Sequence, residues 1–316
     1  MGIVPAAHAF RSAAGTLLLL HALLSVLLQI AWISMPDGFM NIPKNGMNGY
    51  VLAAILMQGI CILLPTLIVL YWFKMPLGTS VGISKSSPGG VLMSITIGIP
   101  AAVVFIGLNN GFLYMLSQLG IALPAAPLPT WSAYQGPRSF AIVVMISVLL
   151  PGIIEELMFR GVIQGSMESE GGQFSAVFLQ AFAFSIFHAD PLFLLAPFLA
   201  GMLLGFVRQR TGSIYSSIFA HMSLNLTILV MEPILPRITS EYFRSAMPSQ
   251  QLLYSSLVAA CIAAVALIPM ILVFPSPSKR VPRIREKLVF FPIDWKFVLA
   301  CLVLISTLLF TYFTNS

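Results

Sequence analysis

The central third of this sequence carries acidic, basic and amide side chains at spacings that suit hydrolytic chemistry. They form three groups: Glu155, Glu156 and Arg160; Phe184 and His188; and His221 and Asn225. A carboxylate and a histidine that converge on one water molecule can deprotonate it. A second histidine with an amide one helical turn away can stabilise an oxyanion. No serine, cysteine or threonine is an evident nucleophile with its own base, so the set fits peptide-bond hydrolysis by an activated water.

A metal centre is the alternative chemistry for the same residues. One carboxylate and two histidines can bind zinc and leave a fourth position open for water. The spacing is not HExxH, so the sequence permits zinc without indicating it. We expect no cofactor, with zinc as the alternative.

Helical spacing separates the two carboxylates. Glu156 precedes Arg160 by four residues, the favourable order for an ion pair on one helix face, and we interpret this pair as mainly structural. Glu155 lies about 100° around the helix from Glu156, so it stays available while its neighbour is neutralised. Phe184 is interpreted as a packing residue rather than a catalytic one.

The composition predicts an integral membrane protein. Of 316 residues, 58% are hydrophobic and only 8% are charged, and the mean hydropathy is +0.96, whereas soluble domains carry about 25% charged residues. The net charge of +6 comes without a basic stripe interleaved with aromatics, so we expect no nucleic-acid partner. The three cysteines lie in apolar runs and indicate small buried residues rather than disulfides.

Nine apolar stretches predict an all-α, polytopic transmembrane bundle of eight to nine spans around a polar intramembrane catalytic cavity. They cover Ala14–Ser34, Tyr50–Phe73, Val91–Leu119, Phe140–Ile163, Phe174–Ala189, Leu192–Val207, Ile214–Met231, Leu252–Phe274 and Phe297–Tyr312. The fifth and sixth are short and meet at Asp190-Pro191, so they form two spans or one bent or re-entrant element. We expect one membrane domain over residues 1–316, with a motif-bearing core at about 140–230 flanked by helices in 1–139 and 231–316.

The polar groups are expected at one depth in the membrane. Counted from the expected inner loops at about 1.5 Å per residue, Glu155 lies about 15 Å deep, His188 about 21 Å and His221 about 12 Å. All three depths fall in the middle part of a hydrocarbon core about 30 Å thick. Ionisable residues within spans indicate a functional site. By contrast His21, alone in the first stretch, is interpreted as a packing or interfacial histidine.

Lysine and arginine counts predict the orientation. With nine spans and a cytoplasmic N-terminus, 11 of these residues lie in inner segments and 4 in outer segments, and the loop Pro275–Lys296 holds six of the eleven. We expect a multi-pass protein of a bacterial plasma membrane with its N-terminus in the cytoplasm.

The three groups of residues resemble the three signature motifs of the CPBP intramembrane proteases. The motifs are Glu155-Glu156-x-x-x-Arg160, Phe184-x-x-x-His188 and His221-x-x-x-Asn225, and Arg210-Thr-Gly-Ser-Ile resembles the family's lead-in to the last motif. That family includes type II CAAX prenyl endopeptidases and bacterial members linked to bacteriocin processing or immunity. The resemblance covers residues 140–230.

The resemblance implies a glutamate-dependent endopeptidase on a bundle of about eight helices. By this likeness Glu155 activates water with help from His188, and His221 and Asn225 form the oxyanion hole. Glu156 and Arg160 match positions that shape and support the site. The ninth apolar stretch departs from an eight-helix core.

The expected partners are the lipid bilayer and a membrane-associated peptide or protein, with or without a lipid attached. Eukaryotic members of the family would imply removal of the last three residues after a prenylated cysteine, whereas bacterial members have varied substrates. A non-catalytic scaffold or immunity protein that keeps the fold is the alternative from another class. A transporter is disfavoured because the charges occupy one third of the chain rather than two repeated halves.

Overall fold

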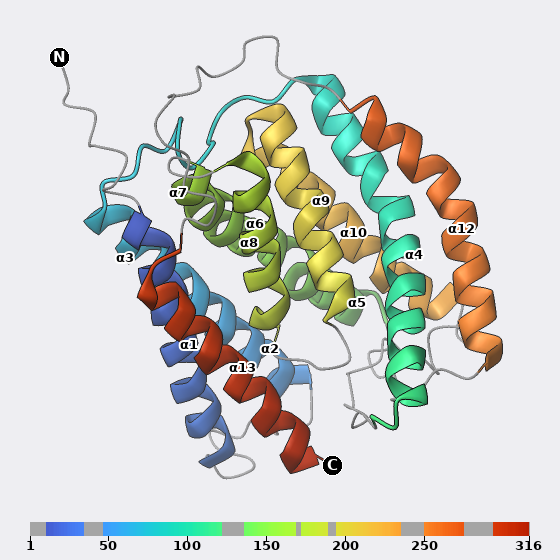
Figure 1. The fold of residues 1–316 in the computed structure, drawn as a ribbon, viewed down its shortest axis with the longest axis horizontal. Coiled ribbons are helices and arrows are strands. Elements are labelled where there is room, and N and C mark those ends of the chain that lie inside the picture. The colour runs from blue at the N-terminus through green and yellow to red at the C-terminus, as the bar shows by residue number, and fades with distance from the viewer. Residues whose placement is uncertain are drawn as a thin grey trace.

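The structure is a computed structural model, and it describes residues 11–34, 47–121, 136–168, 172–188, 194–234, 250–274 and 293–315. These residues form helices joined by short turns, with no strand among them (Figure 1). The elements are α1 (Arg11–Ser34), α2 (Met47–Leu56), η3 (Met57–Leu63), α3 (Leu64–Trp72), α4 (Pro88–Gln118), α5 (Pro137–Val144), η5 (Met145–Leu149), α6 (Leu150–Glu156), η6 (Leu157–Ile163), α7 (Gln164–Glu168), α8 (Gln173–Phe187), α9 (Leu195–Thr211), α10 (Ile214–Ile234), α12 (Gln250–Leu272) and α13 (Trp295–Asn315). The predicted all-α bundle is confirmed.

Two of the expected spans are continuous rods with π-helical turns inside them. One rod runs through α2, η3 and α3, and the other runs from α5 through η5, α6 and η6 to α7. A π-turn widens the helix locally and is often found at functional sites. Both rods contain proline, Pro65 and Pro151, just after a π-turn. Proline has no N–H to donate to the carbonyl four residues earlier, so each rod carries a freed backbone acceptor in its interior.

Six helices or rods of the described chain are long and apolar enough to cross a membrane. They are Ser12–Ser34, Met47–Trp72, Pro88–Gln118, Pro137–Glu168, Ile214–Met231 and Gln250–Leu272. The helix α8 has 15 residues and α9 has 17, so α8 is about 22 Å long and shorter than a hydrocarbon core of about 30 Å. The membrane bundle is established, and the count of eight to nine spans stays a prediction.

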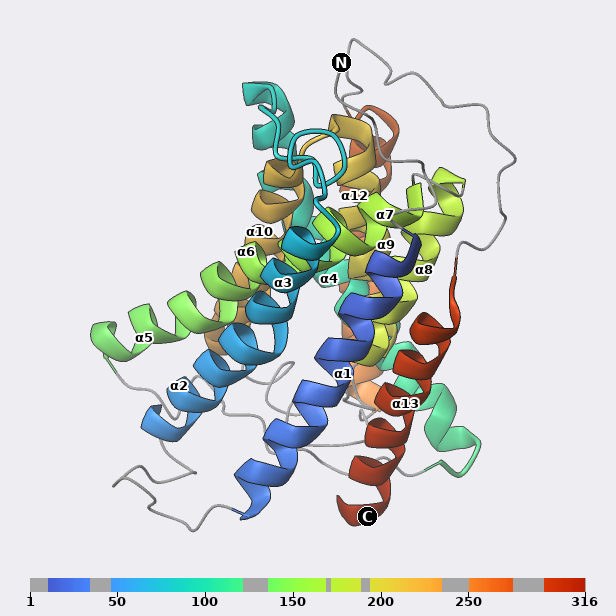
Figure 2. The same cartoon turned by 90° about the vertical axis from the view of Figure 1, so that its left-hand side faces the viewer.

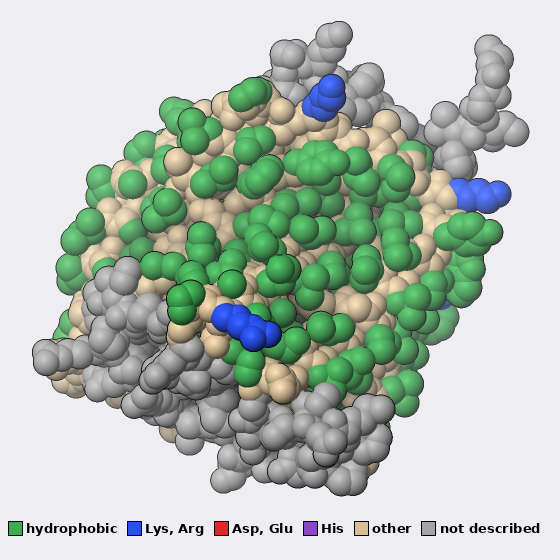
Figure 3. All heavy atoms as spheres, turned by 180° about the vertical axis from the view of Figure 1, so that it is seen from behind, with side chains coloured by type: hydrophobic (Ala, Val, Ile, Leu, Met, Phe, Trp, Pro, Cys, Tyr) green, Lys and Arg blue, Asp and Glu red, His purple; other side chains and the backbone are tan. Residues whose placement is uncertain are grey.

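The surface of the bundle is apolar. Figure 3 shows hydrophobic side chains over most of one face, with lysine and arginine at a few places and no described acidic side chain in view. Large side chains on the outer helices are strongly exposed, such as Val265 at 75% on α12 and Leu27 at 63% on α1. Contiguous apolar surface of this extent requires a nonaqueous surrounding. The protein is therefore a multi-pass membrane protein.

The fifth and sixth apolar stretches form two antiparallel helices, α8 and α9, packed side by side. Gly201 of α9 lies directly on Ala181 of α8, and a Cβ on Gly201 would come within 2.7 Å of the Ala181 Cα. Gly205 lies against Gln180 and Val177 in the same way. Small residues four apart allow such close approach between helices. The Asp190-Pro191 junction lies outside the described residues.

Replacing Gly201 with alanine should separate α8 from α9. Because the closest atoms belong to the Ala181 backbone, the helix must move, and we expect a loss of about 1–2 kcal/mol in unfolding free energy even after the better helix propensity of alanine. Unfolding in detergent, followed by circular dichroism, measures this loss. Gly89→Ala is the matched control, since no atom lies within 4 Å of its added Cβ. Equal stability of the two variants would contradict the close packing.

The ninth apolar stretch forms α13, which packs against α1 (Figure 2). Lys296 Nζ donates to Ser12 Oγ at 2.7 Å and to Thr16 Oγ1 at 3.0 Å. Asp294 caps the start of α13, and its Oδ1 accepts the backbone N–H of Phe297 at 2.9 Å. This last helix is therefore part of the bundle and covers the outer side of α1.

Candidate active site

The candidate site lies where the rod α5–α7 meets α8 and α10 in the interior of the bundle (Figures 1 and 2). The rod supplies the two glutamates and Arg160, α8 supplies Phe184 and His188, and α10 supplies His221 and Asn225. Glu155, Glu156, Arg160, Phe184 and His221 are all buried. Three segments far apart in the sequence thus bring polar groups into an apolar environment, which is costly unless the groups are paired.

Glu156 is the centre of a buried charge cluster. Its Oε1 accepts from Arg160 Nη1 at 2.6 Å and lies 2.9 Å from His221 Nδ1. The expected ion pair between Glu156 and Arg160 is present, and both side chains are 0% exposed. Because this carboxylate is paired with a guanidinium, it acts as the acceptor, and Nδ1 of His221 carries the donated proton. The other ring nitrogen, Nε2, is left free of this contact.

Phe184 joins the charge cluster to both histidines. The Arg160 guanidinium lies 4.4 Å from the centre of its ring, a cation–π distance. The same ring meets the His188 ring edge-on at 4.8 Å and the His221 ring edge-on at 5.9 Å, measured between ring centres. The Phe184 ring therefore contacts Arg160 and both histidines, and its packing role stays a prediction.

His188 lies just past the end of α8 and is held by its own helix. Its Nδ1 lies 2.7 Å from the carbonyl oxygen of Phe184, and a carbonyl only accepts, so Nδ1 must carry the proton. The side chain is exposed, unlike His221. In a neutral ring this bond makes Nε2 the acceptor. His188 thus presents a basic nitrogen away from α8.

Glu155 points elsewhere than Glu156, as the helix geometry predicted. Its Oε1 accepts a hydrogen bond from Gln58 Nε2 at 2.8 Å, across 97 residues of sequence. The side chain is 5% exposed. No described side chain neutralises it directly, since the Arg160 guanidinium donates to Glu156 instead. The two carboxylates therefore have different partners, Arg160 and His221 for Glu156 and Gln58 for Glu155.

Gln58 is a site residue that the sequence reasoning missed. The sequence prediction rested on ionisable residues within apolar stretches, whereas the side chain of Gln58 is neutral. The signal was available, because an amide in the middle of an apolar run requires a partner. Its burial, at 9% exposed, and its bond to Glu155 identify it as part of the site.

Asn225 is half-buried and contacts the rod rather than His221. Its Nδ2 donates to the carbonyl oxygen of Ser147 at 3.1 Å. That carbonyl lies four residues before Pro151, which has no N–H to offer it, so the kink supplies the acceptor. Ser147 Oγ in turn lies 2.9 Å from Tyr50 OH. The amide has a second N–H, which leaves one donor for other use.

The structure thus connects most of the predicted residues through contacts, with two exceptions. Glu156, Arg160, Phe184, His188 and His221 form one contiguous cluster. Glu155 and Asn225 lie beside that cluster on the same helices, and their described hydrogen bonds go to Gln58 and to Ser147. No contact between Glu155 and His188 is present among the described residues. A water or substrate molecule would have to bridge them.

The zinc alternative was tested against the side-chain arrangement. Within the described ranges, no group of three or more His, Cys, Asp and Glu side chains is arranged to hold a metal ion. The three cysteines are free, two of them buried and Cys261 exposed. The described residues therefore do not form a preformed zinc centre.

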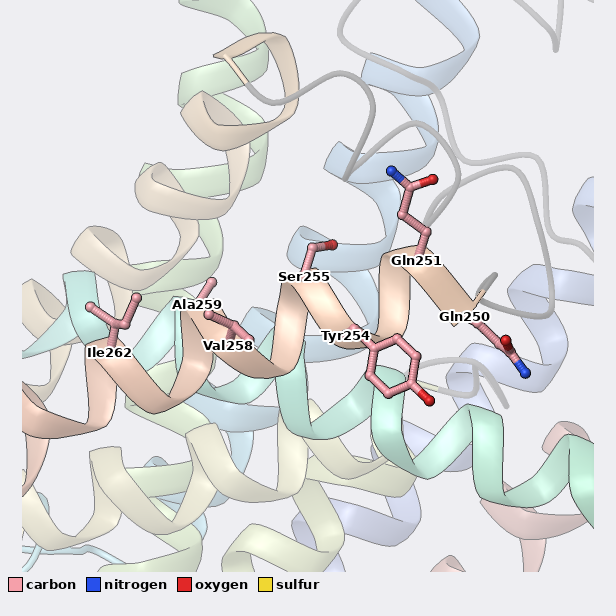
Figure 4. A pocket seen from close by; sticks show the side chains of 7 residues that line it. All are labelled: Gln250, Gln251, Tyr254, Ser255, Val258, Ala259 and Ile262. Carbon is pink, nitrogen blue, oxygen red and sulfur yellow. The ribbon is translucent and has the colours of Figure 1, made fainter.

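The surface has two depressions, one between α4, η5 and α10 and one on α12. An apolar groove of about 500 Å³ runs between α4, η5 and α10 and is lined by Ile95, Ile99, Val144, Val148, Leu149, Phe219, Met222, Ser223, Leu226, Thr227, Val230 and Met231. The groove is lined in part by residues of α10, the helix that also carries His221 and Asn225. The other depression follows the outer face of α12 from Gln250 to Ile262 and contains none of the candidate residues (Figure 4).

Comparison with known proteins agrees with the motif resemblance. Residues 137–227 match the family model of the type II CAAX prenyl endopeptidase Rce1-like proteins. A curated relative, the "Putative membrane peptidase YdiL" of Bacillus subtilis (strain 168), is 30% identical over 95 residues. That match covers 30% of this chain and 39% of the relative. The resemblance to the CPBP proteases is therefore confirmed for residues 137–227, which include α6, α8 and the part of α10 that carries His221 and Asn225.

Proposed function

We propose that this chain, whose residues 137–227 match the type II CAAX prenyl endopeptidase Rce1-like family, is an intramembrane endopeptidase that hydrolyses with an activated water. One observation carries the proposal: both histidines pack on Phe184 beside two buried glutamates contributed by a third segment. Acid–base groups in the middle of membrane helices are rare and mark functional sites.

Glu155 is the proposed general base. It is buried, its Oε1 is held by Gln58, and it is free of the Arg160 pair. Water attacks the peptide carbonyl carbon and gives one proton to Glu155, with the Nε2 of His188 as second acceptor for the same water. The proton on Glu155 then passes to the leaving nitrogen, and the carbon–nitrogen bond breaks. The products are a carboxylic acid and an amine, and the carboxylate of Glu155 is restored.

His221 and Asn225 are the proposed oxyanion donors. Because His221 Nδ1 donates to Glu156, its ring can donate to an oxyanion only with a second proton on Nε2. Asn225 gives one N–H to Ser147 and keeps the other for the oxyanion. Glu156 and Arg160 are supporting groups that hold His221 and Phe184 in place. Donors fixed before reaction stabilise the developing charge without reorganisation.

The proposed substrate is a peptide or protein held in the membrane. The groove between α4, η5 and α10 is apolar, and α10 also carries His221 and Asn225. Such a groove suits a hydrophobic segment or a lipid chain rather than a soluble peptide. Cleavage of lipidated peptides and of the same peptides without a lipid distinguishes the two kinds of substrate.

We also propose a plasma-membrane location with a cytoplasmic N-terminus. The turn after α3 and the turn before α10 are joined, since the N–H of Ile214 donates to Gly82 at 2.9 Å. Two of the expected inner loops, which carry Lys74, Lys85, Arg208 and Arg210, therefore share one end of the bundle. A common basic end supports the orientation from charge counting. The loop Pro275–Lys296 lies mostly outside the described residues.

The test is cleavage of a peptide panel by the purified chain in liposomes. The panel contains hydrophobic membrane peptides and the same peptides with an isoprenoid or an acyl chain on a cysteine near the C-terminus, and products are identified by mass spectrometry. We expect cleavage that persists with a strong zinc chelator. Loss with chelator and recovery with zinc would overturn the metal-free mechanism. No cleavage of any peptide would contradict the protease and favour a non-catalytic scaffold.

A further inference from the structure

The hydrogen bond between Gln58 and Glu155 comes from outside the segment that matches the family. Gln58 lies on η3, in the rod that runs through α2, η3 and α3, whereas the family match begins at residue 137. The bond occupies Oε1 of Glu155, and no described contact occupies Oε2. A carboxylate that acts as a base needs one oxygen for the water. Gln58 therefore orients this carboxylate so that one oxygen is anchored and the other is available.

The π-turn that carries Gln58 is itself pinned by α1. His21 Nδ1 lies 2.8 Å from the carbonyl oxygen of Cys61, so Nδ1 donates. That carbonyl is four residues before Pro65, whose missing N–H leaves it without the usual helix donor. His21 is 1% exposed, and its ring packs on Phe187 at 4.6 Å, next to His188. The sequence predicted a packing or interfacial role for His21, but it did not predict the hydrogen bond from His21 to the carbonyl of Cys61 on η3.

We propose that Gln58 is a positioning residue for Glu155 and that His21 maintains the π-turn from which Gln58 reaches it. The proposal rests on the proposed function, because it assigns Glu155 as the base. It extends the site to α1 and η3, two elements that the three motifs do not include. Gln58 and Cys61 lie three positions apart in the same π-turn. One local distortion of the helix therefore sets both the Gln58–Glu155 contact and the His21–Cys61 contact.

The effect should fall on the chemical step rather than on binding. A hydrogen bond to a charged group is worth enough that its loss changes a rate by about 10- to 100-fold. Gln58 contacts Glu155 rather than the groove between α4 and α10. We therefore expect Gln58→Leu to lower kcat by about 10- to 100-fold with KM unchanged. Thr66→Val is the control, since Thr66 is buried on the same rod and its described side-chain hydrogen bond goes to the Ile62 carbonyl of that rod.

The variant Gln58→Glu should change the pH dependence of activity, which a residue with only a packing role would not affect. It has the same shape, but it can donate to Glu155 only when protonated. The pair must then share one proton, because two adjacent carboxylates resist full ionisation. Activity should persist at low pH and disappear as the pH rises, so the pH optimum moves down. The elements packed on η3 are α1, α2, α3 and α6, whose titratable side chains include His21, Tyr50, Tyr71, Glu155 and Glu156, and Arg160 also interacts with Glu155.

A double variant tests the role of His21. If His21 acts through Gln58, His21→Leu lowers kcat, and adding it to Gln58→Leu lowers kcat no further. All variants are assayed on a peptide that the wild type cleaves, beside Glu155→Gln. Wild-type kcat and an unchanged pH profile in the Gln58 variants, with Glu155→Gln inactive, would overturn this inference alone. Full activity of Glu155→Gln would overturn the proposed function and the inference together.

Discussion

Replacing Glu155 with glutamine should reduce peptide cleavage by about 1,000-fold, the largest effect expected for any single change, because it removes the proposed general base. The variant should still fold, since glutamine has the same shape and its amide oxygen can accept the bond from Gln58. The measurement is kcat on a cleaved peptide in liposomes, with the unfolding midpoint of the same preparation as the check on folding.

Glu168→Gln is the matched control for this experiment. Glu168 belongs to the same rod, at the end of α7, and its carboxylate pairs with Arg208 and accepts from Gln164 rather than facing the site. Its activity should stay within a few-fold of wild type. Comparable activity of Glu155→Gln and Glu168→Gln would remove Glu155 from the mechanism.

Replacing Arg160 with methionine should cause the largest loss of stability. The change leaves the buried Glu156 carboxylate without its guanidinium partner, and loss of one partner from a buried pair costs about 3–5 kcal/mol. It also removes the guanidinium from the face of Phe184. Unfolding free energy in detergent is the measurement, and poor recovery of folded protein is the corresponding outcome in expression.

A second variant separates the charge from the packing. In the double variant Glu156→Gln with Arg160→Met, no buried charge is left without a partner, so most of the lost stability should return. The amide oxygen of the new glutamine can still accept from His221. If the double variant instead lost as much stability as the sum of the losses of Glu156→Gln and Arg160→Met, the two side chains would not be coupled. That result would contradict the charge cluster around Glu156.

Local spacing in the sequence was enough to predict several features of this molecule. Four-residue spacing predicted the pairing of Glu156 with Arg160, and the 100° offset predicted that Glu155 faces another way. These features depend on one helix at a time, where the α-helical period fixes which side chains share a face.

Contacts between distant segments were not predictable in this way. The bonds of Gln58 to Glu155 and of Asn225 to Ser147 join residues 97 and 78 positions apart. They depend on π-turns and on carbonyls freed by Pro65 and Pro151, which change the direction of side chains without changing their spacing in sequence. His188 lies just past the end of α8 rather than within it. Its orientation comes from the bond to Phe184.

The central claim is that a water held by Glu155, rather than a side-chain nucleophile, attacks the peptide carbonyl. The most direct measurement follows the wild-type protein during turnover of a cleaved peptide with hydroxylamine present, by mass spectrometry of the products and of the intact chain. The account predicts two product peptides, one with a free carboxylic acid at its new C-terminus and one with a free amine at its new N-terminus, and no mass added to the protein. A hydroxamate product or an acyl adduct on the chain would contradict it.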